Sequence, residues 1–179
     1  AQLYRKQYKD NILTDPQCLG AYVFLWGSKQ ERTPTWYSMF LPEGQKTRTV
    51  DVMHYLWDGE WPENRSPILD SLKFDGNHLK PNIFVEPGTR HQARVWIDDP
   101  ENDPLEIEWE ILHKTTDKGV GGDAEKKPDK ANFKTVKIQN KTFTFLAPQK
   151  EGAYRLFIYS YDNNGNGAHA NFPFYVKKQ

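Results

Sequence analysis

The sequence has little of several features that would point directly to a function. It has a single cysteine, Cys18, which excludes an internal disulfide, and its place before an apolar run indicates a small buried side chain. The longest apolar run is far shorter than the roughly 18 residues of a membrane span. The five histidines are scattered, without a His-x3-His pair, so a zinc site is not expected. We therefore assign no metal-binding residues and expect no cofactor and no membrane partner.

An excess of charge of one sign is also lacking. The 24 basic residues balance the 24 acidic ones, with 8 of each in residues 1–67 and 16 of each in residues 68–179. Nucleic acids and anionic membranes are attracted by a positive field, which a balanced sequence does not provide. We therefore expect no nucleic-acid partner.

Aromatic side chains, in contrast, are abundant. They make up 14% of the residues and include six tryptophans. Four of the tryptophans fall in the first 61 residues: Trp26, Trp36, Trp57 and Trp61. Large rings fill a core, but they also form surfaces that stack on sugars or bases. Trp57 and Trp61 flank a change in the sequence pattern, so we expect them to pack between the two parts of the chain that this change separates.

Residues 1–57 have the pattern of an α/β unit. Apolar residues at helical spacing predict a helix over about residues 2–13, and a second helical stripe covers Val50–Trp57. Between them, the run Leu19–Trp26 is apolar at successive positions, which is typical of a strand buried on both faces of a parallel sheet. A short helix is predicted over Pro34–Leu41, because proline is favoured at the first helical position.

After the polar segment "DGEWPENRSP" the apolar pattern changes to a period of two. Strands are expected over residues 68–74, 83–86, 90–97, 105–112, 133–138, 142–146, 153–161 and 168–176. Short strands separated by turns predict an immunoglobulin-like antiparallel β-sandwich, with Trp109 facing its core. The predicted fold class is therefore α+β, with an α/β segment in residues 1–66 and the sandwich in residues 67–179.

The segment "YRKQYKDNILTDPQCLGAYVFLWGSKQ", residues 4–30, resembles the helix-7 and strand-8 segment of the (β/α)8 barrel in clan A retaining glycosidases, family 2 most of all. The resemblance covers about residues 3–57. In that family the strand ends on a tryptophan that borders the sugar-binding pocket, and Trp26 falls on that position. The resemblance thus implies that residues 1–66 derive from the end of a TIM barrel. It also implies a substrate-binding role for four residues: Trp26, Lys29, Glu31 and Trp36.

No catalytic residue falls within this resemblance. Retaining glycosidases use two carboxylates roughly 5 Å apart, which in this family lie at the ends of barrel strands 4 and 7, before Ala1. Glu31 is a candidate acid, but between Gln30 and Arg32 on a polar loop it fits a solvated or ion-paired side chain. The resemblance therefore implies the C-terminal part of a secreted or periplasmic glycoside hydrolase that acts on a β-linked carbohydrate and is inactive alone.

Two alternatives stay open. The sandwich can be a free-standing module that binds a polysaccharide or a protein partner, because sandwiches host many functions. The chain can also form a homo-oligomer through residues 1–57, because a strand without neighbours leaves unpaired backbone groups that invite pairing with a second copy.

An acidic turn is expected between two strands of the sandwich, with Asp98, Asp99, Glu101 and Asp103 close together. Oxygen ligands on a turn suit calcium. The sequence lacks an Asp-x-Asp-x-Asp-Gly loop, however, and acidic turns are common without an ion. The sequence therefore leaves calcium binding at this turn open.

Overall fold

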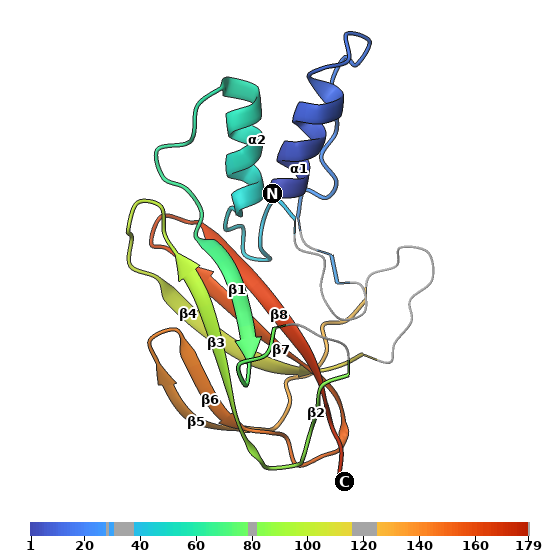
Figure 1. Ribbon diagram of the computed structural model, residues 1–179, viewed down its shortest axis with the longest axis vertical. Coiled ribbons are helices and arrows are strands. Elements are labelled where there is room, and N and C mark those ends of the chain that lie inside the picture. Colours follow the sequence, from blue (N-terminus) through green and yellow to red (C-terminus); the bar gives the residue numbers. More distant parts are fainter. Residues whose placement is uncertain (28, 31–37, 79–81, 116–124, 179) are drawn as a thin grey trace.

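The chain forms a helical layer that stands on one end of a β-sandwich (Figure 1). The computed structural model describes residues 1–27, 29–30, 38–78, 82–115 and 125–178. The helices are α1 (Gln2–Gln7), which continues into a π-helix (Tyr8–Ile12), and α2 (Arg48–Asp58). The strands are β1 (Ile68–Phe74), β2 (Phe84–Val85), β3 (Arg90–Asp98), β4 (Glu106–His113), β5 (Lys134–Gln139), β6 (Thr142–Leu146), β7 (Gly152–Tyr161) and β8 (Gly167–Val176). The predicted α+β class is confirmed.

The strands pair into two four-stranded sheets, with the orders β1-β3-β6-β5 and β2-β8-β7-β4. All neighbours are antiparallel except that the short β2 runs parallel to β8. The first order corresponds to the A-B-E-D sheet of an immunoglobulin constant-type domain, and β8-β7-β4 corresponds to its G-F-C sheet. The expected immunoglobulin-like sandwich is therefore formed, with β2 added at one edge.

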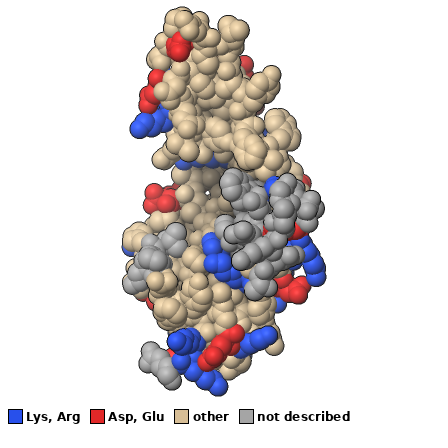
Figure 2. Space-filling view, turned by 90° about the vertical axis from the view of Figure 1, so that its right-hand side faces the viewer, with Lys and Arg blue, Asp and Glu red and all other residues tan. Residues whose placement is uncertain are grey.

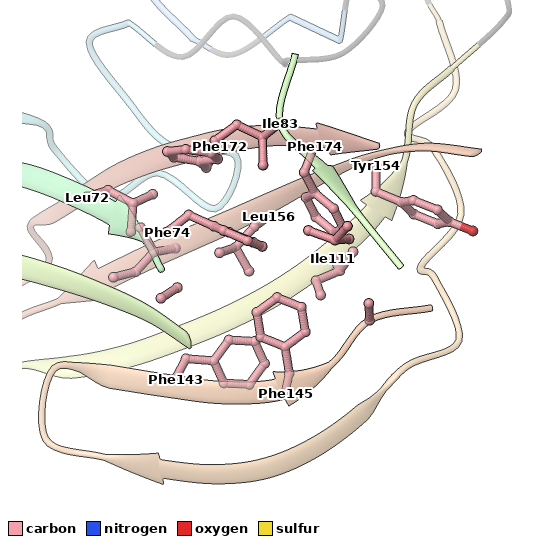
Figure 3. Packing of buried hydrophobic residues seen from close by; sticks show 14 of the residues in the cluster. Leu72, Phe74, Ile83, Ile111, Phe143, Phe145, Tyr154, Leu156, Phe172 and Phe174 are labelled. Atoms are coloured by element: carbon pink, nitrogen blue, oxygen red, sulfur yellow. The ribbon is translucent and has the colours of Figure 1, made fainter. Parts of the chain in front are cut away.

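The core lies between the two sheets because alternate residues of each strand face inward. On β7 the inward side chains are those of Tyr154, Leu156 and Ile158, all fully buried. Aromatic rings from both sheets fill the space between them: Phe74, Phe143, Phe145, Phe172 and Phe174 (Figure 3). Burial of one such side chain contributes about 1.5–3 kcal/mol, so this cluster is the main source of stability.

Two features of immunoglobulin domains recur in this core. The hydroxyl of Tyr154, at the start of β7, donates a 2.7 Å hydrogen bond to the carbonyl of Lys150, which is the geometry of a tyrosine corner. Trp109, on β4, packs against the core as predicted, and its ring stacks on Phe143 with the centroids 5.3 Å apart. These contacts fix how the two sheets face each other without a disulfide.

The helical layer has a small core of its own. Thr47 caps α2 by accepting a hydrogen bond from the backbone N–H of Thr49, and Gly59 ends the helix with a φ of 82°. Tyr8 of the π-helix and Met53 of α2 are buried together with Met39. Both helices predicted for the described part of this segment, over residues 2–13 and 50–57, are thus confirmed.

The strand expected over Leu19–Trp26 is not formed, and this corrects the sequence-based prediction. Its backbone contacts the 38–39 segment through three hydrogen bonds: Leu25 N donates to Ser38 Oγ at 3.2 Å, Ser38 Oγ donates to the Phe24 carbonyl at 3.3 Å, and Met39 N donates to the Leu25 carbonyl at 3.4 Å. An apolar run becomes a buried strand only where neighbouring strands supply a ladder of partners. Cys18, expected to be buried, is only partly so.

The short helix expected over Pro34–Leu41 is not formed in the described part of that range. Residues 38–41 are not helical, and residues 34–37 lie outside the described residues. Phe40 instead forms an isolated antiparallel bridge with Lys46, so this stretch is a turn that returns the chain toward α2.

Polar contacts join the helical layer to the sandwich. Lys46 pairs with the β7–β8 turn, donating its N–H to Gly165 at 3.0 Å and accepting from Gly167 at 2.8 Å. Asp51 of α2 is buried and accepts a 2.8 Å hydrogen bond from the backbone N–H of Ser66. Burial raises the pKa of Asp51, and the hydrogen bond from Ser66 acts in the opposite direction.

The tryptophans expected to pack between the two parts behave differently. Trp61 stacks on Tyr55 of α2, with the centroids 4.6 Å apart, and the Arg5 guanidinium lies over both rings. Trp57 is largely exposed, so its expected role at the junction is wrong. Its position on α2 turns the ring toward solvent.

Candidate functional site

The predicted substrate-binding residues lie on the segment that leaves α1 and returns toward α2. Trp26 exposes 68% of its surface, and its ring lies 5.0 Å from that of Phe40. Lys29 follows three residues later and is partly buried. Glu31 and Trp36 lie outside the described residues. The structure therefore places Trp26 on an accessible surface beside one further ring.

The backbone before Trp26 is held from two sides. The hydroxyl of Tyr4, on α1, donates to the carbonyl of Phe24. The hydroxyl of Ser38 donates to the same carbonyl at 3.3 Å and accepts from Leu25 N. These bonds set the direction of the segment although no strand ladder is present.

Over residues 22–26, exposed side chains alternate with partly buried ones, and the backbone bends at Phe24 and Trp26. Val23 packs against the cluster of Tyr8, Met39 and Met53. The exposed side chains of this segment are apolar: Tyr22, Phe24 and Trp26, with Leu19 before them. We call these four residues the apolar face. Such a row of rings can stack on a sugar or pack against another polypeptide.

A hollow lies on the outer face of the sheet, between β4, β7 and the turn at Pro42. It has a volume of about 280 Å³ and is lined by Pro42, Glu108, Glu110, Tyr159 and Tyr161, among others. Glu110 is buried, and its Oε1 accepts hydrogen bonds from the Tyr159 hydroxyl at 2.9 Å and from Lys127 Nζ at 2.8 Å. A carboxylate held in this way is neutralised by its partners and suits a structural role.

This hollow was not predicted from the sequence. The signal was the stretch Tyr154–Tyr161, in which both alternating faces carry large side chains. Phe157 and Tyr159 form a second buried cluster with Leu112 on the outer face. A strand that is apolar on both faces indicates that its outer face is also covered.

The four acidic residues of the turn between β3 and β4 form two groups with different partners. Asp98 forms an ion pair with Lys141 at 2.9 Å, and Glu101 forms one with Arg65 at 2.7 Å. Asp99 and Asp103 instead lie close to Asp162, which belongs to the β7–β8 turn. The partner of the acidic turn is thus a residue that the sequence analysis did not single out.

Comparisons with known proteins found only remote similarity. No family model and no curated protein matches the chain. The chain is similar to a solved nucleoside hydrolase-related hypothetical protein from Saccharophagus degradans that is associated with carbohydrate metabolism, with 13% identity and a TM-score of 0.44. It is also similar to two structures of PcoC, a copper resistance protein from Escherichia coli, each with 16% identity, with TM-scores of 0.32 and 0.31.

The extent of these matches differs. The first covers 72% of this chain but 29% of the Saccharophagus protein, so the chain spans less than a third of that protein's length. The PcoC matches cover 65% and 63% of this chain and 100% and 99% of PcoC. At these TM-scores the similarities assign no function to this chain.

The described surface shows two further properties. On the face in Figure 2, basic and acidic side chains of the described residues are interspersed, and the helical end is largely uncharged. Among the described helices, none is long and apolar enough to cross a membrane.

Proposed function

We propose that this chain is the C-terminal portion of a secreted or periplasmic retaining glycoside hydrolase that acts on a β-linked carbohydrate. In this proposal residues 1–66 complete the catalytic barrel, and the sandwich is an accessory domain. The observation that carries the proposal is the apolar face. Leu19 and Tyr22 are fully exposed, and Phe24 and Trp26 each expose 68% of their surface.

These four side chains are apolar but are exposed to water. Burying a large apolar side chain contributes about 1.5–3 kcal/mol, which this chain forgoes at four positions within eight residues. Clustered exposed apolar residues mark an interaction site more often than scattered ones do. The segment therefore requires a partner that covers it.

The form of the segment indicates what kind of partner fits. Exposed and partly buried side chains alternate over residues 22–26 with the period of a strand, although the backbone bends at Phe24 and Trp26. Neighbouring parallel strands would supply the missing backbone ladder, and Trp26 would then lie at the carboxyl end of its strand. Substrate-binding residues lie at that end in (β/α)8 barrels.

The test uses a longer chain that includes the coding sequence upstream of Ala1. We expect this longer chain to hydrolyse aryl β-glycosides and residues 1–179 alone to leave them intact. In the longer chain, Trp26→Ala should lower kcat/KM by about tenfold or more, because a sugar-facing ring stabilises the bound substrate. Trp57→Ala is the matched control, since Trp57 is similarly exposed but lies on α2, and its kcat/KM should change less than about twofold.

Two results would contradict the proposal. Turnover by residues 1–179 that disappears in Glu31→Gln would show that the catalytic machinery lies within this chain. An upstream sequence that encodes no barrel, together with binding of residues 1–179 to a polysaccharide, would favour the free-standing module instead.

A further inference from the structure

Three carboxylates meet where the helical layer joins the sandwich. Asp99 and Asp103 come from the β3–β4 turn and Asp162 from the β7–β8 turn, and one oxygen of each lies within 4.8 Å of the others. Antiparallel pairing of β4 with β7, which begins at Glu106 opposite Tyr161, brings the two turns together. Asp99 and Asp162 are buried, so this cluster is not a patch of solvated surface acids.

The two turns are built in the same way. Oδ1 of Asp99 accepts from the backbone N–H groups of Glu101 and Asp103, both at 2.9 Å. Oδ1 of Asp162 accepts from those of Asn164 and Asn166, both at 2.8 Å. Each aspartate thus uses one oxygen to close its own turn, which leaves the second oxygen for the cluster.

The sequence of the second turn carries a related signal. The stretch "DNNGNG", residues 162–167, follows the first half of the Asp-x-Asn/Asp-x-Asn/Asp-Gly pattern of calcium loops. The Glu that completes such a loop is replaced by Pro173. In this fold the β3–β4 turn supplies the additional carboxylates from outside the loop.

Two buried side-chain oxygens of these turns have no hydrogen-bond partner among the described residues. Asp99 is only 9% exposed, and its Oδ2 has no hydrogen-bond partner within the described part of the chain. Asn166 is completely buried, and its Oδ1 is unpaired within the same residues. A buried charged oxygen without a partner is strongly unfavourable. Among the described residues, no Lys or Arg forms an ion pair with Asp99, Asp103 or Asp162.

Side-chain amides complete the cluster. Asn64 and Asn164 each donate Nδ2 to Asp103 Oδ2, at 2.6 and 2.8 Å. Asn166 donates Nδ2 to Asp162 Oδ2 at 2.6 Å. A half-turn of any of these amides exchanges its NH2 group for a carbonyl oxygen, which is a calcium ligand.

From these observations we infer that Asp99, Asp103 and Asp162, with Asn64 and Asn166, form a binding site for Ca²⁺. Every available donor is a hard oxygen, which excludes the softer transition metals as the preferred occupant. The donors come from three separate segments, which suits the flexible and high coordination of Ca²⁺ better than the strict octahedron of Mg²⁺. Because Asn64 lies between α2 and β1, the ion would fasten the helical layer to the sandwich.

The test is calorimetric titration of the full chain with CaCl2, combined with thermal unfolding in EDTA, in about 5 mM CaCl2 and in the same concentration of MgCl2. We expect one Ca²⁺ per chain and a rise of roughly 5–10 °C in Tm when the site is saturated about 100-fold over Kd. MgCl2 should raise Tm much less. The inference does not depend on the proposed glycosidase function.

Asp99→Asn and Asp162→Asn are the informative variants. Each keeps the oxygen that closes its turn and removes one charge, so the fold is retained while the affinity for Ca²⁺ falls by about tenfold or more. Asp70→Asn, which removes an exposed charge from β1, is the matched control and should bind as the wild type does. Absence of a binding heat and of a Tm shift in the wild type would overturn the inference. An equal Tm shift in Asp162→Asn, or an equal effect of Mg²⁺, would do the same.

Discussion

His169 lies on β8, opposite Tyr159 of β7, and its side chain is half-buried. Desolvation lowers the pKa of His169 to about 4. The unfolded chain exposes the same imidazole to water, where its pKa is about 6.5. This single side chain therefore makes the stability of the sandwich depend on pH.

The sign of the dependence follows from proton binding. Between pH 6.5 and 4 the unfolded state binds a proton at His169 and the folded state does not, so the free energy of unfolding falls as the pH falls. The total loss is at most about 3 kcal/mol. Urea denaturation across this pH range measures it in the wild type and in His169→Gln. The difference between the two curves should flatten above pH 6.5, and parallel curves at all pH values would contradict the assignment.

At the scale of elements, the tyrosine corner allows a specific prediction about the stability of the sandwich. Tyr154→Phe removes the hydroxyl that binds the Lys150 carbonyl and keeps the ring that stacks on Phe174. We expect a loss of about 1 kcal/mol in the free energy of unfolding, because only one hydrogen bond is removed. Tyr175→Phe, at the more exposed edge beside Phe84, is the control and should change stability by less than about 0.5 kcal/mol. Equal effects in the two variants would show that the corner has no special role.

The strands of the sandwich were predictable because their signal is local. The expected bounds of β1 and β6 agree with the structure at both ends, and those of β7 differ by one residue at its start. Alternation with a period of two and the turns between strands suffice for this. The same signal does not specify a partner. An apolar run such as Leu19–Trp26 therefore predicts a strand, although the described chain offers no ladder to pair with it.

The candidate calcium site was half predictable for the same reason. Asp99 and Asp103 are close in sequence and were expected to lie together. Asp162 joins them only through the pairing of β4 with β7, which is a property of the folded sandwich. Conversely, the ion pairs of Asp98 and Glu101 with Lys141 and Arg65 remove these two acids from the cluster, and no sequence pattern indicates which acids are removed.

At the scale of the whole molecule, the two parts of the chain differ in how much of their apolar surface they bury. The sandwich buries its inward apolar faces between its own sheets. One edge strand of each sheet is either short, as β2 is, or exposed, as β5 is. The helical layer buries a small cluster around Met39 and Met53 and leaves the apolar face in water. The net charge of zero does not oppose self-association. When the barrel that we propose as its partner is missing, a second copy is the nearest substitute.

We therefore expect the full chain to form dimers or larger assemblies through residues 1–57, and residues 68–179 to fold alone as a monomer. Sedimentation at roughly 50 µM tests both, because a dimer with a micromolar Kd is well populated at that concentration. Trp26→Ala should shift the full chain toward monomer, since it removes a ring from the apolar face, and Trp57→Ala should leave the assembly unchanged. Hydrogen exchange gives the second readout, with amides of residues 19–26 protected in the assembly and exchanging rapidly in the monomer. If both chains sediment as monomers and these amides exchange slowly, the segment finds its partner within its own chain, and the assembly does not exist.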